Sequence, residues 1–213
     1  MTSSRRSIKA LLFDWDGTVV DSAHLGLSAF EQSFAELGFV FDHELYRSAY
    51  SPNWYLVYEA MGLPKENWQR ADELWIQHYG EQTAKPLAGA AETITELKRK
   101  GYQLGVVSSG SECRVIREVN ESGLENCFDV IVCNEQMNNK KPHPEGLEIA
   151  LRALGTASET GGYVGDSPDD IEMGKRANML TVGVRSDYPT SWKLESQNPD
   201  IFIESLSELL KHF

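Results

Sequence analysis

The chain has 213 residues, of which 41% are hydrophobic and 24% are charged, and this composition is ordinary for a globular protein. The length suits one domain or a domain that carries a large insert. The net charge of −12 argues against nucleic acid and anionic membranes as partners, because both repel an acidic surface.

The N-terminal segment and the cysteines indicate the compartment. The apolar stretch from Ala10 to Phe13 is far too short for a signal peptide, and no run approaches the roughly 18 apolar residues of a spanning helix. Cys113, Cys127 and Cys133 have no metal-ligand spacing and are predicted to be free thiols. We therefore expect a cytoplasmic protein in a reducing environment.

Short apolar segments alternate with amphipathic ones along most of the chain. The predicted buried strands are Lys9–Phe13, Gln103–Val107, Asp129–Cys133, Gly162–Val164 and Leu180–Val184. The predicted helices are Ala90–Lys100, Ser111–Ser122, Pro144–Leu154 and Asp169–Ala177. This alternation predicts an α/β fold, a Rossmann-like parallel sheet with helices on both faces.

One long segment breaks the alternation, because residues 21–83 show helical patterns and no convincing strand. We predict a small all-helical cap at residues 20–84, inserted after the first strand, and an α/β core at residues 1–19 and 85–213. Two sets of aromatic residues in the insert have helical spacing, and we interpret both as its internal packing. They are Tyr50, Trp54 and Tyr58, and Trp68, Trp75 and Tyr79.

The strongest motif follows the first strand, where Phe13 leads into Asp14-Trp15-Asp16-Gly17-Thr18. A plain Asp-Gly turn is one interpretation. A calcium-binding loop is another, but it would need glycine and glutamate where Val19 and Leu25 stand. The remaining interpretation is a pair of catalytic carboxylates at the end of a strand.

Three more polar motifs follow predicted strands. Ser108-Ser109-Gly110 can offer backbone N–H groups at a helix N-terminus as an anion site. Lys140-Lys141-Pro142 can place an ammonium over a site, although most such lysines are solvated. Residues 166–170 (Asp-Ser-Pro-Asp-Asp) can cap a helix or supply oxygen ligands to a hard cation.

Strand ends of one parallel sheet can bring these motifs to a single crevice, where ligands of such sheets bind. A phosphate dianion there would be repelled by Asp14, Asp166 and Asp170. Mg²⁺ and the Lys141 ammonium would supply three compensating positive charges, and Asp16 can act in its protonated form. Each close pair of unit charges is worth roughly 4 kcal/mol at an effective dielectric near 20. The set therefore predicts a magnesium-dependent phosphate site.

The four motifs, in this order over nearly the whole chain, resemble the haloacid-dehalogenase-like (HAD) hydrolase superfamily. The Asp-x-Asp-Gly-Thr form is similar to its phosphatases, and the helical insert resembles the phosphoglycolate-phosphatase-like branch with a C1 cap. The resemblance implies an Mg²⁺-dependent phosphatase that hydrolyses a small organic phosphate monoester through an aspartyl-phosphate intermediate.

The resemblance also implies the roles of individual residues. Asp14 would be the nucleophile and a metal ligand, and Asp16 the general acid and base, with its backbone carbonyl on the metal. Thr18 would orient Asp16. Phosphate contacts would come from Ser108, the Ser109 N–H and Lys141, which would bridge Asp14 and the phosphate. Asp166 would be a direct metal ligand, and Asp170 a ligand or an anchor through water.

Two other functions stay open at this point. A sugar phosphomutase (beta-phosphoglucomutase-like) has the same residues around the metal but returns the phosphoryl group to a sugar. A response-regulator-like module also forms a phospho-aspartate, but its motif order differs and it lacks both the second acid and the insert.

The turn at residues 50–54 is expected to reach the crevice, with Asn53 and Trp54 as substrate contacts. Because this turn carries no cation, we expect a small, polar, hydroxylated organic phosphate rather than one with a second strongly anionic group. The protein is expected to be a monomer or a weak homodimer.

Overall fold

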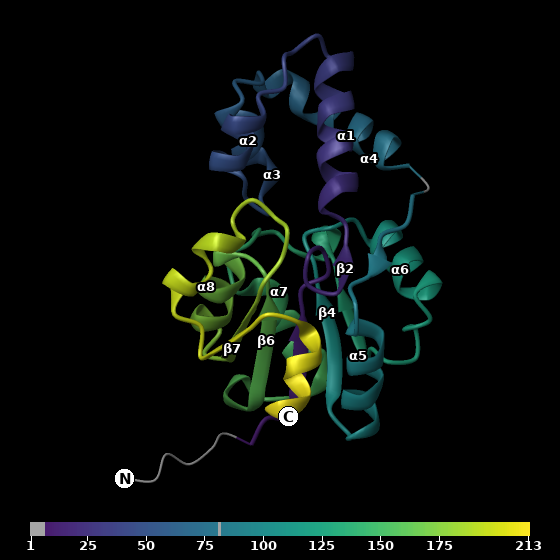
Figure 1. Ribbon diagram of the computed structural model, residues 1–213, viewed down its shortest axis with the longest axis vertical. Helices are drawn as coiled ribbons and strands as arrows, with labels where there is room; N and C mark the ends of the chain where they lie inside the picture. Colours follow the sequence, from purple (N-terminus) through teal and green to yellow (C-terminus); the bar gives the residue numbers. More distant parts are fainter. Residues whose placement is uncertain (1–6, 81) are drawn as a thin grey trace.

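A six-stranded parallel sheet forms the centre of the protein (Figure 1). The computed structural model describes residues 7–80 and 82–213, so the first six residues, which enter the N-terminal predictions, lie outside it. The strand order is β5-β4-β1-β6-β7-β8. The strands are β1 (Ala10–Phe13), β4 (Gln103–Val107), β5 (Val130–Val132), β6 (Gly161–Gly165), β7 (Leu180–Val184) and β8 (Ile201–Ile203). The predicted α/β fold is confirmed.

Helices cover both faces of the sheet because its strands are buried on both sides. On β1, Leu11 and Phe13 pack into one hydrophobic cluster and Leu12 into another, as the two-residue period of a strand requires. The first face is covered by α5 (Ala90–Arg99), α6 (Glu112–Glu121) and a 3-10 helix at Leu206–Lys211. The second is covered by α7 (Glu145–Leu154) and α8 (Pro168–Arg176).

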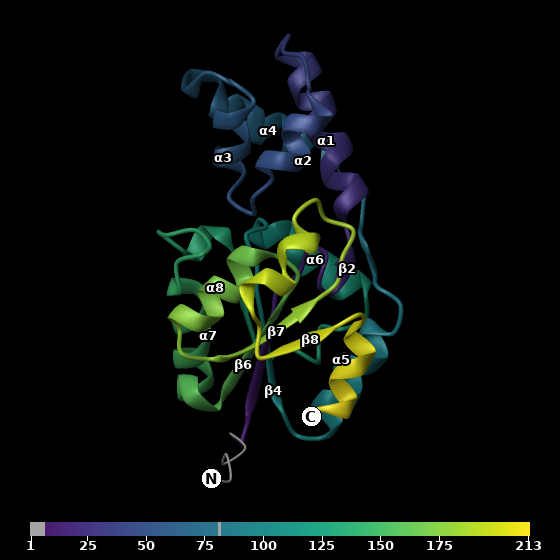
Figure 2. The same ribbon diagram turned by 60° about the vertical axis from the view of Figure 1, so that its left-hand side comes forward.

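The helical insert lies beyond the carboxyl ends of the strands (Figure 2). Its helices are α1 (Ala23–Glu36), α2 (His43–Ala49), α3 (Trp54–Ala60) and α4 (Trp68–Tyr79), and they share a hydrophobic cluster centred on Phe34 and Tyr58. The chain leaves and re-enters the core through a short antiparallel pair, β2 (Val20–Asp21) with β3 (Lys85–Pro86). This pair places both connections of the insert beside the end of β1.

Two features were absent from the sequence prediction. The β2–β3 pair has only two residues per strand, and β8 has three, so neither is long enough to show a periodic pattern. Strand β8 is fixed beside β7 by Asp200, whose carboxylate accepts hydrogen bonds from the backbone and the side chain of Thr181. In residues 7–80 and 82–213, short 3-10 helices make up the remaining regular structure: Lys65–Asn67, Asn134–Gln136, Ser158–Thr160, Ser191–Lys193 and Glu195–Gln197.

Within the described residues, no helix combines the length and apolar character needed to cross a membrane. The three cysteines are free thiols.

Candidate active site

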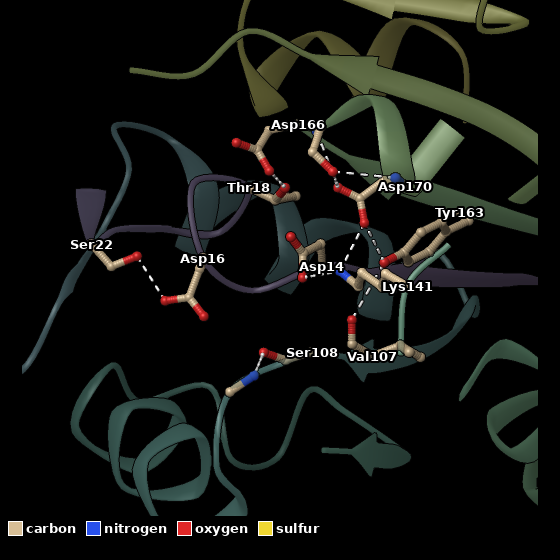
Figure 3. A network of polar contacts seen from close by, with 12 residues as sticks. Asp14, Asp16, Thr18, Ser22, Val107, Ser108, Lys141, Tyr163, Asp166 and Asp170 are labelled. Atoms are coloured by element: carbon tan, nitrogen blue, oxygen red, sulfur yellow. Dashed lines mark hydrogen bonds and ion pairs between the residues drawn. The ribbon is translucent and has the colours of Figure 1, made fainter. Parts of the chain in front are cut away.

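Asp14 lies directly beyond β1, at the middle of the sheet, and it is buried. The Lys141 ammonium donates to Asp14 Oδ1 at 2.6 Å and to Asp170 Oδ1 at 2.7 Å, so one buried cation joins two buried carboxylates (Figure 3). Asp170 is itself held by the Tyr163 hydroxyl at 2.9 Å and by the Ser167 hydroxyl at 2.5 Å. The structure thus brings the first, third and fourth motifs together.

Asp166 completes a group of three carboxylates. One oxygen from each of Asp14, Asp166 and Asp170 lies within 4.8 Å of the others, and all three residues are buried. Carboxylate oxygens at this spacing suit a hard divalent cation. Asp166 also accepts from the Ser186 hydroxyl at 2.5 Å and from Thr18 Oγ1 at 3.4 Å. The Thr18 hydroxyl therefore contacts Asp166, and the orienting contact to Asp16 that the resemblance implied is not made here.

Gly17 permits the close packing around Asp166. Its φ is +78°, and a Cβ there would lie 2.5 Å from both Asp166 Oδ2 and the Tyr188 ring. Only glycine fits this left-handed position without displacing the carboxylate.

Asp16 lies apart from the carboxylate group. Its carboxylate accepts from Ser22 Oγ at 2.7 Å, which Figure 3 shows, and from both terminal nitrogens of Arg114 at 2.9 and 2.6 Å. Burial alone would raise the pKa of Asp16, but the Arg114 charge and these hydrogen bonds outweigh it and lower the pKa. In this arrangement Asp16 is an anion whose side chain is held by a buried arginine.

The Arg114 contact was not predicted from the sequence. Arg114 also donates to the buried Glu118 at 3.0 Å, and Glu118 accepts from Trp15 Nε1 at 2.8 Å and from the Tyr79 hydroxyl at 2.9 Å. This network connects the Asp14 loop, α6 and the last turn of α4. Arg114 and Glu118 are four apart on α6, a spacing typical of a surface ion pair, so the sequence held no signal that they were buried.

The loop after β4, Ser108-Ser109-Gly110, also lies at the site. Ser108 is buried, and its Oγ accepts from the Gly110 N–H at 2.9 Å. Ser109 and Gly110 line the cavity that contains Asp14 and Lys141. The loop is therefore placed where an anion bound beside Asp14 would meet its N–H groups.

The charge balance of the site shifts several pKa values. Burial, followed by the nearby Asp170 and Asp16 charges, raises the pKa of Asp14 to about 7 even though Lys141 opposes the rise. Burial and the charges of Asp14 and Asp170 raise the pKa of Asp166 well above its usual value. Three buried carboxylates face one ammonium, so full ionisation would leave an excess of negative charge, and the raised pKa values mean that protons offset this excess when no further cation is bound.

A cavity of about 240 Å³ extends from Asp14 toward the helical insert. Trp54 lines it, as predicted for a substrate contact, whereas Asn53 does not, and its buried Oδ1 has no hydrogen-bond partner in the described residues. Five of the six aromatic residues that we interpreted as internal packing also line the cavity: Tyr50, Trp54, Tyr58, Trp75 and Tyr79. The interpretation was incomplete, because helix faces that pack on each other also enclose this space.

Residues 11–184 match the family of haloacid dehalogenase-like hydrolases. The chain belongs to this family. The resemblance and the prediction of an enzyme are thereby confirmed, and the response-regulator alternative is wrong. Among curated proteins, the chain is 31% identical over 207 residues to a protein named pyrophosphatase PpaX from Listeria monocytogenes, with 95% of each chain covered.

Solved structures of this family share the fold. CbbY from Rhodobacter sphaeroides, solved with xylulose-(1,5)bisphosphate, is 26% identical with a TM-score of 0.79, covering 95% of this chain and 96% of that one. A beta-phosphoglucomutase from Clostridium difficile is 23% identical with a TM-score of 0.78, covering 95% and 93%, and at this identity the likeness concerns the fold alone. The site roles, the domain boundaries, the cytoplasmic location and the oligomeric state stay predictions.

The raised pKa values predict how the stability of the metal-free protein depends on pH. The pKa of Asp14 is about 7 in the folded protein against 3.8 as its ordinary value, so between these values the unfolded state binds fewer protons than the folded state. The free energy of unfolding should therefore fall as the pH rises from about 4 to about 7. Asp16, whose pKa is lowered, contributes with the opposite sign and only at more acidic pH.

Urea unfolding in EDTA at about pH 5 and about pH 7.5 measures this dependence. Asp14→Asn removes one of the responsible carboxylates and should flatten the fall, whereas Glu66→Gln, at an exposed position, should leave it unchanged. An identical fall in the wild type and in Asp14→Asn would contradict the assignment.

Proposed function

We propose that the chain is an Mg²⁺-dependent phosphatase that hydrolyses a small organic phosphate monoester through a phosphorylated Asp14. The observation that carries this proposal is the Lys141 ammonium between Asp14 and Asp170, beside the group of three carboxylates. The names of the relatives support a reaction on a small phosphorylated compound in general, because one is called a pyrophosphatase and another was solved with a bisphosphate, and the choice of a monoester is part of the proposal.

Asp14 and Asp166 would hold the metal directly, together with the predicted backbone carbonyl of Asp16, while Asp170 anchors Lys141. When bound, Mg²⁺ supplies positive charge that offsets these carboxylates and allows a phosphate dianion to enter. The protein's own part in phosphoryl transfer is mainly to position groups and to stabilise charge.

In the first step, an Asp14 carboxylate oxygen attacks phosphorus and the bond to the ester oxygen breaks. For this step Asp16 must first leave Arg114 and take up a proton from solvent, which it then passes to the departing alcohol. Lys141 and the N–H groups of the Ser108–Gly110 loop stabilise the phosphoryl oxygens, and Lys141 also fixes the direction of the attacking carboxylate.

In the second step, Asp16 takes a proton from water, the water oxygen attacks phosphorus, and the bond to Asp14 breaks to release phosphate. Arg114 stabilises Asp16 as the anion that this step requires. Because Arg114 also draws Asp16 away from Asp14, substrate binding must be accompanied by rotation of Asp16 toward the ester oxygen.

We also propose that residues 20–84 act as a cap domain over the residues 1–19 and 85–213 that perform the chemistry. Three contacts between the two parts support a cap that can close over the site. Ser51 Oγ donates to Asp169 at 3.0 Å, the Tyr50 and Tyr188 rings lie 5.2 Å apart, and the Tyr79 hydroxyl donates to Glu118. Closure at these contacts would exclude bulk water from the site.

A sugar phosphomutase remains the alternative, since it would use the same attack by Asp14. It differs in the acceptor, because the phosphoryl group returns to a sugar instead of water. Release of one inorganic phosphate for each ester consumed distinguishes the two reactions.

The nucleophile and the metal are tested together. Wild-type protein with Mg²⁺ should hydrolyse p-nitrophenyl phosphate, and either excess EDTA or Asp14→Asn should abolish turnover while circular dichroism shows an intact fold. Asp187→Asn serves as the matched control and should retain activity. Asp187 is exposed and has no proposed role, although its sequence neighbours Ser186 and Tyr188 lie at the site. Full activity in EDTA, or near-wild-type rates in Asp14→Asn, would contradict the mechanism.

The role of Asp16 as an acid predicts a dependence on the leaving group. Asp16→Ala should slow hydrolysis of an alkyl phosphate by about 10²–10⁴-fold, and it should slow p-nitrophenyl phosphate less, since a phenolate leaves without protonation. A partial defect on the phenyl ester is still expected, because the second step needs Asp16 as a base. Equal losses on both esters would show that Asp16 does not protonate the leaving group.

A further inference from the structure

Aromatic rings line much of the cavity, and six of them, five on the helical insert and Tyr188 on the core, have their polar atoms bonded within the protein. Trp54 Nε1, the Tyr55 hydroxyl and the Tyr58 hydroxyl all donate to the Asp72 carboxylate, at 2.9, 3.0 and 3.1 Å. Trp75 Nε1 donates to a backbone carbonyl at 3.2 Å, the Tyr79 hydroxyl to Glu118, and the Tyr188 hydroxyl pairs with Ser22 at 3.0 Å. The N–H and O–H donors of these six rings are therefore engaged within the protein, and a sugar-like ligand could use only the tyrosine oxygens, as acceptors, without breaking these bonds.

The charged side chains around the cavity also limit which ligands can bind. Of the described residues that line the cavity, the cations are Lys141 and Arg114, and each is paired with two carboxylates. The lysine and arginines of the insert that the structure describes, Arg47, Lys65 and Arg70, are exposed and do not line the cavity. The wall instead carries the Asp72 carboxylate.

Asp72 is itself balanced from within the protein. Besides its three ring donors, it lies in the field of Lys140, whose ammonium is 4.3 Å from the centre of the Trp54 ring. Because three donors and Lys140 already offset the Asp72 charge, Asp72 offers a cationic ligand group little to repay that group's loss of water. A second anionic group would meet Asp72, and the described lining residues offer it no unpaired cation. The wall thus disfavours both signs of charge and favours an uncharged group that can bury apolar surface.

We infer that the site takes the phosphate monoester of a small, uncharged alcohol bearing an aromatic ring, and that it discriminates against pyrophosphate and other ligands with a second anionic group. This inference rests on the proposed phosphatase function. It keeps the sequence expectation that a second anion is disfavoured, and it replaces a hydroxylated leaving group by an aromatic one. The cavity of about 240 Å³ suits a phosphoryl group and one ring.

The first arm of the test compares four substrates with Mg²⁺: 2-phenylethyl phosphate, ethyl phosphate, phosphoglycolate and pyrophosphate. The two alkyl esters have similar chemistry and differ in the ring. We expect kcat/KM for the phenylethyl ester to exceed that for the ethyl ester by at least about tenfold, since even one buried methylene is worth that much. Phosphoglycolate and pyrophosphate, which carry a second anionic group, should both have a lower kcat/KM than the phenylethyl ester.

The second arm changes the charge of the wall. Ile76 on α4 lines the cavity but is 58% exposed, so Ile76→Lys adds a cation there at little structural cost. It should raise kcat/KM for phosphoglycolate relative to the phenylethyl ester by about tenfold, a change that lies between the effects expected for a close charge pair in water and near a protein surface. Ile76→Gln tests the loss of the apolar side chain alone, and Leu56→Lys adds the same charge at a 50% exposed position outside the cavity. Neither control should change the preference in this way.

The outcomes separate this inference from the function on which it rests. If pyrophosphate or phosphoglycolate is the better substrate, or if Leu56→Lys acts like Ile76→Lys, the inference is overturned while the phosphatase function stands. If no ester is hydrolysed, including p-nitrophenyl phosphate, the proposed function is overturned and the inference with it.

Discussion

A single buried ammonium, that of Lys141, holds the candidate site together. A lysine taken out of water costs several kcal/mol unless it is paired, and here Asp14 and Asp170 pair it at 2.6 and 2.7 Å. The three residues come from the end of β1, the loop before α7 and the first turn of α8. The position of the proposed nucleophile therefore depends on the packing of three separate elements around one charge.

The remaining charges follow from this arrangement. Asp166 adds a third carboxylate without adding a cation, so the site is left with an excess of negative charge that a divalent ion can offset. Asp16 is kept out of that group because Arg114 and Ser22 bind its carboxylate elsewhere. Two carboxylates separated by one residue thus have opposite electrostatic surroundings. In the metal-free protein the pKa of Asp14 is raised and that of Asp16 is lowered, which is the reverse of what a nucleophile and a general acid require. The proposed mechanism therefore depends on positive charge from a bound cation at Asp14 and on release of Asp16 from Arg114.

The parts of the site that follow a strand could be predicted from the sequence, because parallel strands deliver their carboxyl ends to one edge. Asp14, Ser108 and Asp166 each come directly after a strand. Arg114 and Glu118 could not be predicted, since only the packing of α6 against Trp15 and Tyr79 buries them. Strand β8 was missed because three residues carry no periodic signal, and its position depends on the long-range contact between Asp200 and Thr181.

The aromatic wall marks the point where sequence patterns give an incomplete answer. Helical spacing predicted that Trp54, Tyr58 and Trp75 face inward, and they do, but one inner face can be both a packing surface and a cavity lining. Asp72 contributes to this double role, because it binds the polar ends of Trp54, Tyr55 and Tyr58 and leaves their ring carbons toward the cavity. Under this account, residues at the ends of the sheet strands carry out the reaction, and residues of the insert select the substrate.

Chemical trapping of the phosphorylated enzyme tests the central claim most directly. Acid-quenched enzyme, sampled during turnover with Mg²⁺ and reduced with borohydride, should contain homoserine at position 14, because an acyl phosphate is reduced and a free carboxylate is not. Peptide mass spectrometry locates the reduced residue, and a sample without substrate is the control. Homoserine at position 14 only during turnover is the predicted result. Reduction at another carboxylate, or at none while phosphate is released, would contradict the account.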